Sequence, residues 1–123
     1  MSLFSSLNSI ASDLFRRREE LLPPKNIKRA FTLVLDLDET LVHFDIRSDQ
    51  FRVRPFCRQF LHEMAQCFEI VVYTAAQKDY ADFILDKLDP HGDMIKHRLY
   101  RHHCQFKGRT CIKDLSRLGR PLH

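Results

Sequence analysis

Apolar side chains recur at every second position from Phe31 to Leu35, with threonine and valine between them. A period of two is typical of a strand with a buried face. A second run, from Phe68 to Tyr73, is apolar at nearly every position and is followed by Thr74. The pattern therefore predicts two buried strands, each of which ends at polar residues.

Apolar residues at helical spacing follow both predicted strands. Pro55 is expected to begin a helix that runs to about Gln66, because proline is favoured in the first turn. A second helix is predicted from about Gln77 to Leu88 and ends at the turn-forming residues 89–92. The apolar residues that these two helices should bury are Phe56, Phe60, Leu61, Met64, Tyr80, Phe83, Ile84 and Leu88.

The remaining segments are shorter. Residues 43–54 predict a small hairpin, residues 95–112 a strand pair, and residues 113–118 a short helix that Gly119 would cap. This order of elements predicts an α/β fold with a Rossmann-like parallel sheet and a small β-hairpin insert. The connection from Thr40 to Pro55 is too short for a cap domain, so we expect an open site that suits a phosphorylated side chain on a large partner.

Two carboxylates, Asp36 and Asp38, directly follow the first predicted strand, and Thr40 comes two residues later. Alternate residues of a strand share a face, so these side chains are expected to cluster where the strand ends. That edge is the ligand crevice of an open α/β sheet. Two neighbouring carboxylates repel each other, and Mg²⁺ would offset this repulsion while also binding a phosphate. An N-cap role for the pair is the alternative interpretation.

The predicted chemistry is phosphoryl transfer to a carboxylate, in which one aspartate attacks phosphorus and the other moves the proton. Thr74 is expected to donate a hydrogen bond to a phosphate oxygen. Lys113 and Arg101 are candidate cations for the same phosphate. Taken alone, Thr74 would be a strand-terminating residue, and the two cations would be solvated side chains.

Residues 3–15 place apolar side chains at helical spacing, and three arginines follow them. Three roles remain open for this amphipathic helix: docking on the domain or on a partner, a membrane-surface anchor, or a mitochondrial presequence. Two prolines then end the helix. We therefore expect residues 1–26 to form an N-terminal helix and linker, and residues 27–123 to form one domain.

Net charge, the lack of nucleic-acid-binding signatures and the cysteine spacing restrict the possible substrates and cellular locations. The net charge of +4 suits anionic substrates or acidic partners. No zinc-finger or RNP signature occurs, so direct nucleic-acid binding is not expected. The four cysteines fit no zinc template, and no secretory signal is visible, which predicts reduced, buried thiols in the nucleus or cytoplasm. Adjacent His102 and His103 are expected on opposite faces of a strand at the surface.

The segment from Asp36 to His43, DLDETLVH, resembles the signature of the haloacid dehalogenase superfamily. More narrowly, it is similar to the phosphatases of the RNA polymerase II C-terminal domain, including their small-phosphatase-like branch. The other segments that carry this resemblance are 53–61, 68–75, 80–90, 98–104 and 112–120.

The resemblance implies that Asp36 is the nucleophile and that Asp38 is the acid and then the base. It also implies that Mg²⁺ binds the Asp36 carboxylate and the Asp38 backbone carbonyl. Thr40 belongs to the same motif, Thr74 and Lys113 would hold the phosphate, and Arg101 would contact the substrate.

This sequence departs from the family pattern in two places. Phe56 stands where the family usually has glycine. The family's last motif, an apolar strand leading to an Asp-Asp or Asp-Asn pair, would follow Leu122, but the sequence stops at His123. We therefore expect a C-terminally truncated domain that lacks its last core strand and one metal ligand, with an open edge on the strand from Phe31 to Leu35.

Two functions are compatible with these features. The first is a Mg²⁺-dependent protein serine/threonine phosphatase acting through an aspartyl phosphate, for example on phosphoserine of the RNA polymerase II C-terminal domain. The second is a catalytically weak or dead scaffold or binding module, for which the phosphatase-like domain of a mitochondrial import subunit is the precedent. Mitochondrial or membrane-surface association belongs with the second function and with the open roles of residues 3–15.

Overall fold

The computed structural model describes residues 20–25 and 31–122. Contacts divide the chain into two compact units, Asn26–Lys113 and a second unit of Met1–Lys25 with Asp114–His123. The helix predicted over residues 3–15 lies outside the described residues, so its three roles remain predictions. The boundary expected between residues 26 and 27 also stays a prediction.

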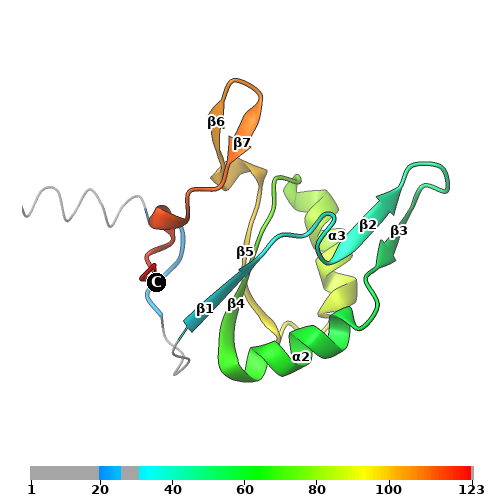
Figure 1. Ribbon diagram of the computed structural model, residues 1–123, viewed down its shortest axis with the longest axis horizontal. Coiled ribbons are helices and arrows are strands. Elements are labelled where there is room, and N and C mark those ends of the chain that lie inside the picture. Colours follow the sequence, from blue (N-terminus) through cyan, green and yellow to red (C-terminus); the bar gives the residue numbers. More distant parts are fainter. Residues whose placement is uncertain (1–19, 26–30, 123) are drawn as a thin grey trace, which may run out of the picture. The chain divides into compact units, whose positions relative to one another are not determined.

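A parallel sheet of three strands forms the centre of the first unit (Figure 1). The strands are β1 (Phe31–Leu35), β4 (Phe68–Tyr73) and β5 (Ile95–Leu99), in the order β1-β4-β5. Both strands predicted from the apolar runs are therefore present and parallel. The third was not recognised as a core strand, because residues 95–112 were interpreted as a single strand pair.

Two antiparallel hairpins extend from the sheet (Figure 1). The first pairs β2 (Val42–Asp45) with β3 (Gln50–Val53), which confirms the hairpin expected over residues 43–54. The second pairs β6 (Gln105–Lys107) with β7 (Thr110–Ile112). Gly108 turns this second hairpin with a positive φ of 65°.

Two α-helices, α2 (Cys57–Cys67) and α3 (Lys78–Leu88), connect the three core strands. Their existence confirms the prediction, but the buried stripe of α2 differs from the expected one. Phe56 precedes α2 in a left-handed conformation and is 79% exposed, and Phe60 is also exposed. The helix buries Leu61, as predicted, together with Cys57, which was not in the predicted stripe. Met64 is partly buried against the core.

The helix α3 buries Ala81, Ile84, Leu85 and Leu88, whereas Phe83 is exposed. Ile84 and Leu88 were therefore predicted correctly, and Phe83 was not. Two 3₁₀ helices complete the elements of residues 20–25 and 31–122, η1 (Arg101–His103) and η2 (Leu115–Leu118). The short helix expected before Gly119 is thus the 3₁₀ helix η2, and Gly119 caps it with a φ of 72°.

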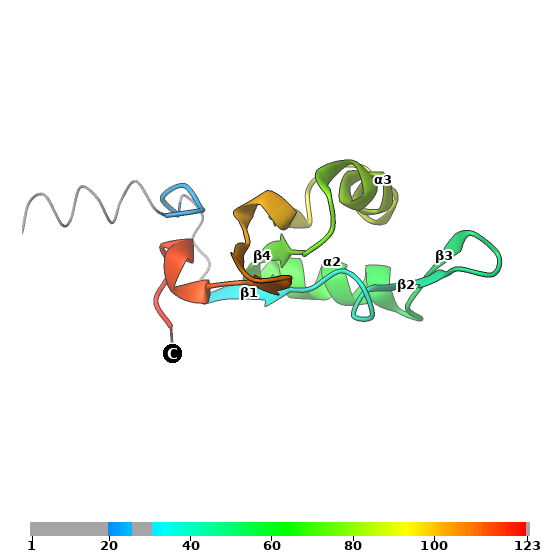
Figure 2. The ribbon, with the colours of Figure 1, turned by 90° about the horizontal axis from the view of Figure 1, so that it is seen from above.

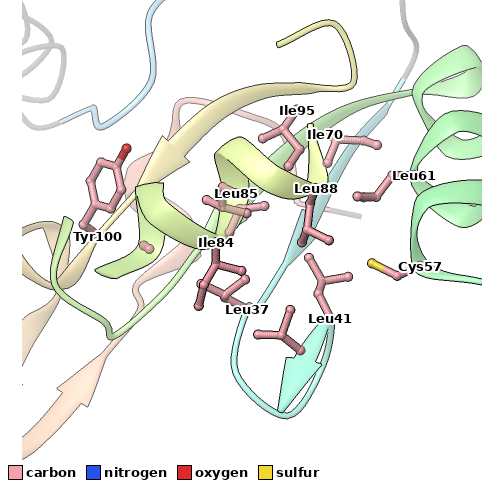
Figure 3. Packing of buried hydrophobic residues seen from close by; sticks show 13 residues of the cluster. Leu37, Leu41, Cys57, Leu61, Ile70, Ile84, Leu85, Leu88, Ile95 and Tyr100 are labelled. Carbon is pink, nitrogen blue, oxygen red and sulfur yellow. The ribbon is translucent and has the colours of Figure 1, made fainter. Parts of the chain in front are cut away.

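The core of the first unit lies between the sheet and its two helices (Figures 2 and 3). Leu61 of α2, Leu85 of α3 and Ile70 of β4 belong to the same buried cluster. Two right-handed crossovers that proceed in one direction along a sheet place their helices on one face, which explains this shared cluster. Leu37 and Leu41 from the loop after β1 also lie in it, so the core anchors that loop.

The strand β1 is less buried than its sequence predicted. Phe31 is 54% exposed, and the rest of the strand is partly buried. The reason is its position: among the described residues β1 pairs only with β4 and forms an edge of the sheet.

The cysteines and histidines also differ from expectation. Cys104 and Cys111 form a disulfide, and Cys67 is exposed, so only Cys57 matches the expected buried thiol. His102 and His103 lie in η1 rather than in a strand, and their ring centroids are 4.0 Å apart. A 3₁₀ helix brings the two rings together, whereas a strand would have separated them.

Candidate active site

The carboxyl ends of the three core strands bring the predicted site residues to one edge of the sheet. Leu35 is aligned with Val72, and Tyr73 is aligned with Leu99. Asp36 therefore follows β1 at the same edge where Thr74 follows β4. This edge is the ligand crevice expected for an open α/β sheet.

Asp36 contacts a cation at this edge. Its Oδ1 lies 3.0 Å from Nζ of Lys113, and the same oxygen accepts a hydrogen bond of 2.7 Å from the Leu37 backbone N–H. The side chains of Asp36 and Lys113 are 46% and 26% exposed. The carboxylate is thus held by two donors through one oxygen and remains accessible to solvent.

A tight turn comes after Asp36 and sets the direction of the next residues. The Leu37 carbonyl accepts hydrogen bonds from the backbone N–H groups of Leu41, at 2.9 Å, and Val42, at 3.2 Å. Glu39 adopts a positive φ of 61°, which is uncommon for a residue with a side chain. The reasoning that Asp36, Asp38 and Thr40 share a strand face is therefore wrong, because the strand ends at Leu35 and the turn orients the residues after it.

Asp38 contacts a residue that the sequence interpretation had assigned only to the core. The Tyr80 hydroxyl donates a hydrogen bond of 3.1 Å to Oδ1 of Asp38. Burial, together with the nearby Asp38 charge, raises the pKa of Tyr80 to about 12, so the phenol keeps its proton at neutral pH. The sequence could have indicated this contact, because the hydroxyl of a tyrosine on the buried face of a helix usually needs a hydrogen-bond partner.

Thr74 is buried at the end of β4. Its Oγ1 accepts a hydrogen bond of 3.0 Å from the Ala76 N–H, and its own N–H donates to the Leu99 carbonyl at 2.9 Å. A hydroxyl that accepts one bond can still donate its proton. Thr74 therefore presents a donor of fixed position at the sheet edge.

The remaining predicted residues, Thr40 and Arg101, have other neighbours. Thr40 lines two cavities beside the β2–β3 hairpin, of about 350 and 320 Å³. The Arg101 backbone N–H donates to the Ala76 carbonyl at 3.0 Å, which fixes η1 beside the loop after β4. Its guanidinium lies over the Phe106 ring, 5.0 Å from the centroid. No contact joins either side chain to Asp36 within the described part of the chain.

Asp36 and Asp38 are the two carboxylates of the predicted metal site. No group of three or more histidine, cysteine, aspartate or glutamate side chains with metal-binding geometry occurs in residues 20–25 and 31–122. Mg²⁺ is commonly held by one or two carboxylates together with water and phosphate oxygens. The oxygen donors of Asp36 and Asp38 fit that kind of site.

A protein-family profile described as "NLI interacting factor-like phosphatase" matches residues 31–123. The chain belongs to this family. A member from Caenorhabditis elegans, "CTD small phosphatase-like protein 3", is 35% identical over 96% of the chain and 47% of its own length. A second relative is the "Mitochondrial import inner membrane translocase subunit TIM50" of Candida albicans, 38% identical over 85% of the chain and 24% of its own length.

A solved structure has a similar fold. The fission yeast RNA polymerase II CTD phosphatase Fcp1, determined with beryllium fluoride, matches 78% of the chain with a TM-score of 0.50 and 20% identity. This likeness confirms the predicted α/β fold. The chain spans about half or less of the length of these relatives. In the part of the chain that the structure describes, no helix has the length and apolar character needed to cross a bilayer.

Proposed function

We propose that this chain contributes the catalytic residues of a Mg²⁺-dependent protein serine/threonine phosphatase that forms an aspartyl phosphate. The observation that carries the proposal is the ion pair between Asp36 and Lys113 at the carboxyl edge of the sheet. Membership of a phosphatase family supports the same reaction class. The roles of the individual residues follow from their chemistry and contacts.

Asp36 is the proposed nucleophile. Its Oδ1 bonds to the Leu37 N–H and Lys113, so its Oδ2 is available to attack phosphorus. In the first step, a bond forms between this oxygen and phosphorus while the ester bond to the serine or threonine oxygen breaks. The product is a phosphate covalently attached to Asp36.

Asp38 is the proposed acid and base. In the first step, its carboxyl group gives a proton to the departing serine or threonine oxygen. In the second step, it removes a proton from water, whose oxygen attacks phosphorus. The bond between phosphorus and Asp36 then breaks and releases inorganic phosphate, so both aspartates return to their starting states.

The phosphate is held by cations and by hydrogen-bond donors. Lys113 offsets the negative charge that Asp36 and the phosphoryl group bring together. Thr74 would donate its hydroxyl proton to a phosphate oxygen. Thr40 and Arg101 are proposed as further phosphate or substrate contacts, because both follow core strands at the same edge.

The Asp36 carboxylate and the Asp38 backbone carbonyl would hold Mg²⁺. A bound Mg²⁺ supplies positive charge beside the transferring phosphoryl group. A phosphorylated protein is the expected substrate, because no separate cap domain lies between β1 and α2 to enclose a small metabolite. Phosphoserine of the RNA polymerase II C-terminal domain is the specific candidate, because a relative is named a CTD small phosphatase-like protein.

Asp36→Asn tests the nucleophile. We expect this variant of the full chain to lose hydrolysis of p-nitrophenyl phosphate in the presence of Mg²⁺ to below about one thousandth of the wild-type rate, as for removal of a covalent catalyst. Asp49→Asn is the matched control, because Asp49 is exposed in the β2–β3 turn. Unchanged turnover in Asp36→Asn would exclude Asp36 as the nucleophile, and unchanged turnover in EDTA would exclude the Mg²⁺ requirement.

A second function is a phosphatase-like binding module, favoured by the similarity to a mitochondrial translocase subunit. In that case the folded chain would bind a phosphopeptide or another segment without turnover, and Asp36→Asn would leave binding unchanged. The two functions imply different locations in the cell. A nuclear or cytoplasmic location is expected for the phosphatase, and mitochondrial or membrane-surface association is expected for the binding module. A fusion of the full chain to a fluorescent reporter distinguishes these locations.

A further inference from the structure

We infer that Tyr80 is a positioning residue that orients the Asp38 carboxyl group for proton transfer to the leaving oxygen. The inference rests on the function proposed above. It assigns a role to a helix residue that is far from Asp38 in the sequence and that the sequence interpretation had placed in the core.

The contact itself joins two elements. Tyr80 lies in the first turn of α3, and its hydroxyl donates to Oδ1 of Asp38 at 3.1 Å. Asp38 lies in the turn between β1 and β2, where the backbone is held by hydrogen bonds to Leu37. The Tyr80 hydroxyl is the side-chain group that bonds the Asp38 carboxylate within the described part of the chain.

The position of the Tyr80 ring is set from two sides. It packs against the hydrophobic core that contains Ala81, Ile84 and Leu37. On another side it meets the ring of Phe44 in β2, edge to face, with centroids 6.3 Å apart. A ring held by both the core and the hairpin cannot follow the motion of the partly buried Asp38 carboxylate, so it fixes the carboxylate instead.

The bond has a geometric consequence for catalysis. With Oδ1 occupied by the Tyr80 hydroxyl, the proton of the Asp38 carboxyl group is carried by Oδ2. One rotamer and one oxygen are thereby selected for the transfer. Without the bond, the side chain would sample several rotamers, and only a fraction of them would present the proton to the leaving oxygen.

The test uses two substrates that differ in their need for a proton. The serine oxygen of a phosphoserine peptide is a poor leaving group unless it receives a proton as it departs. The p-nitrophenolate released from p-nitrophenyl phosphate is stable without a proton. The ratio kcat/KM reports the step in which the leaving group departs, and it excludes the later hydrolysis of the Asp36 phosphate, which both substrates share. The full chain is assayed with Mg²⁺ as wild type and as Tyr80→Phe.

For Tyr80→Phe we expect kcat/KM to fall about 10- to 100-fold for the phosphoserine peptide, which is part of the rate enhancement that a general acid provides. For p-nitrophenyl phosphate, kcat/KM should change less than about three-fold. Asp38→Asn should show the same selective loss, and adding Tyr80→Phe to it should cause little further change. Equal losses for both substrates, or no loss for either, would overturn the inference.

Tyr100→Phe is the matched control. The Tyr100 hydroxyl also donates to an aspartate of α3, Oδ1 of Asp82 at 2.5 Å, but it makes no contact with Asp38. This variant should leave the ratio between the two substrates unchanged, and a selective loss here would contradict the inference. A wild-type chain that hydrolyses neither substrate would overturn the proposed function together with this inference, whereas hydrolysis without selectivity in Tyr80→Phe would overturn this inference alone.

Discussion

Lys113 and Asp36 come from opposite ends of the first unit and meet through one contact of 3.0 Å. Both side chains are partly exposed, and ion pairs of this kind contribute little to the stability of the fold. The same proximity matters much more for a reaction in which a phosphoryl group adds negative charge beside Asp36. At the scale of single residues, the pair is therefore expected to act on catalysis rather than on folding.

Replacement of Lys113 by methionine tests this distinction. We expect kcat for p-nitrophenyl phosphate to fall by about 10²–10³, as when one preorganised electrostatic donor is removed. The unfolding free energy in urea should change by less than about 1 kcal/mol. Lys107→Met, in the exposed strand β6, is the control. A large loss of stability with unchanged kcat would show that Lys113 has a structural role instead.

Some residues of the candidate site could be identified from the sequence, and others could not. Asp36 and Asp38 lie in one short motif, so their residue types and spacing were enough to select them. Lys113 was selected because it follows a predicted strand. Tyr80 was missed as a partner of Asp38, because helical spacing accounts for a buried tyrosine without revealing where its hydroxyl points.

The connection between α3 and β5 is organised by one buried carboxylate. Asp89 ends α3, and its Oδ2 accepts backbone hydrogen bonds from Met94, at 3.2 Å, and Ile95, at 2.9 Å. These bonds fix the start of β5, whose other end leads into η1 and Arg101. At the scale of elements, Asp89 thus determines how the third core strand enters the sheet.

For Asp89→Ala we expect a loss of about 1–3 kcal/mol in the free energy of unfolding, because two backbone N–H groups lose their acceptor inside the protein. The measurement is urea unfolding followed by circular dichroism. Asp93→Ala serves as the control, since Asp93 is an exposed residue of the same loop. A loss below about 0.5 kcal/mol in Asp89→Ala, the range of surface substitutions, would contradict the assignment.

Helices and strands were predicted correctly where a segment has a single hydrophobic pattern. The prediction failed where one segment contains several different elements. The strand β4 is a nearly continuous apolar run and the helix α3 has one clear helical period, and both were predicted nearly to their ends. Residues 95–112 contain a core strand, a 3₁₀ helix and a hairpin. Lys96, His97 and Arg98 interrupt the apolar pattern of β5, so pairing with β4, rather than hydrophobicity, identifies it as a core strand.

A cluster of charges on α3 and β5 links the stability of the whole molecule to pH. Asp82 accepts hydrogen bonds from Lys78, Arg98 and Tyr100. Burial raises the pKa of Asp82, but the hydrogen bonds from these three groups lower it more, to about 2 from an ordinary 3.8. A lowered pKa in the folded state stabilises the protein above the ordinary pKa, and this stabilisation disappears as the pH falls through the folded-state value.

We therefore expect Asp82→Asn to be less stable than wild type by about 2 kcal/mol at pH 7, because the folded-state pKa of Asp82, about 2, lies well below its ordinary value. The difference should shrink between about pH 4 and pH 2, where wild-type Asp82 becomes protonated. Urea unfolding at pH 7, 4 and 2.5 measures it, with Asp79→Asn, an exposed residue of the same helix, as the control. A difference that stays constant over this range would refute the linkage.

The sequence alone determined the fold class, the order of most elements and the identity of the two catalytic candidates, since each depends on local spacing or on a short motif. Only the tertiary structure decided which residues meet. The turn after Leu35 replaced the expected strand alternation, and the hydroxyl of Tyr80 reached Asp38 from another element. Contacts of this kind depend on how elements pack in space, which hydrophobic periodicity specifies only by face and not by partner.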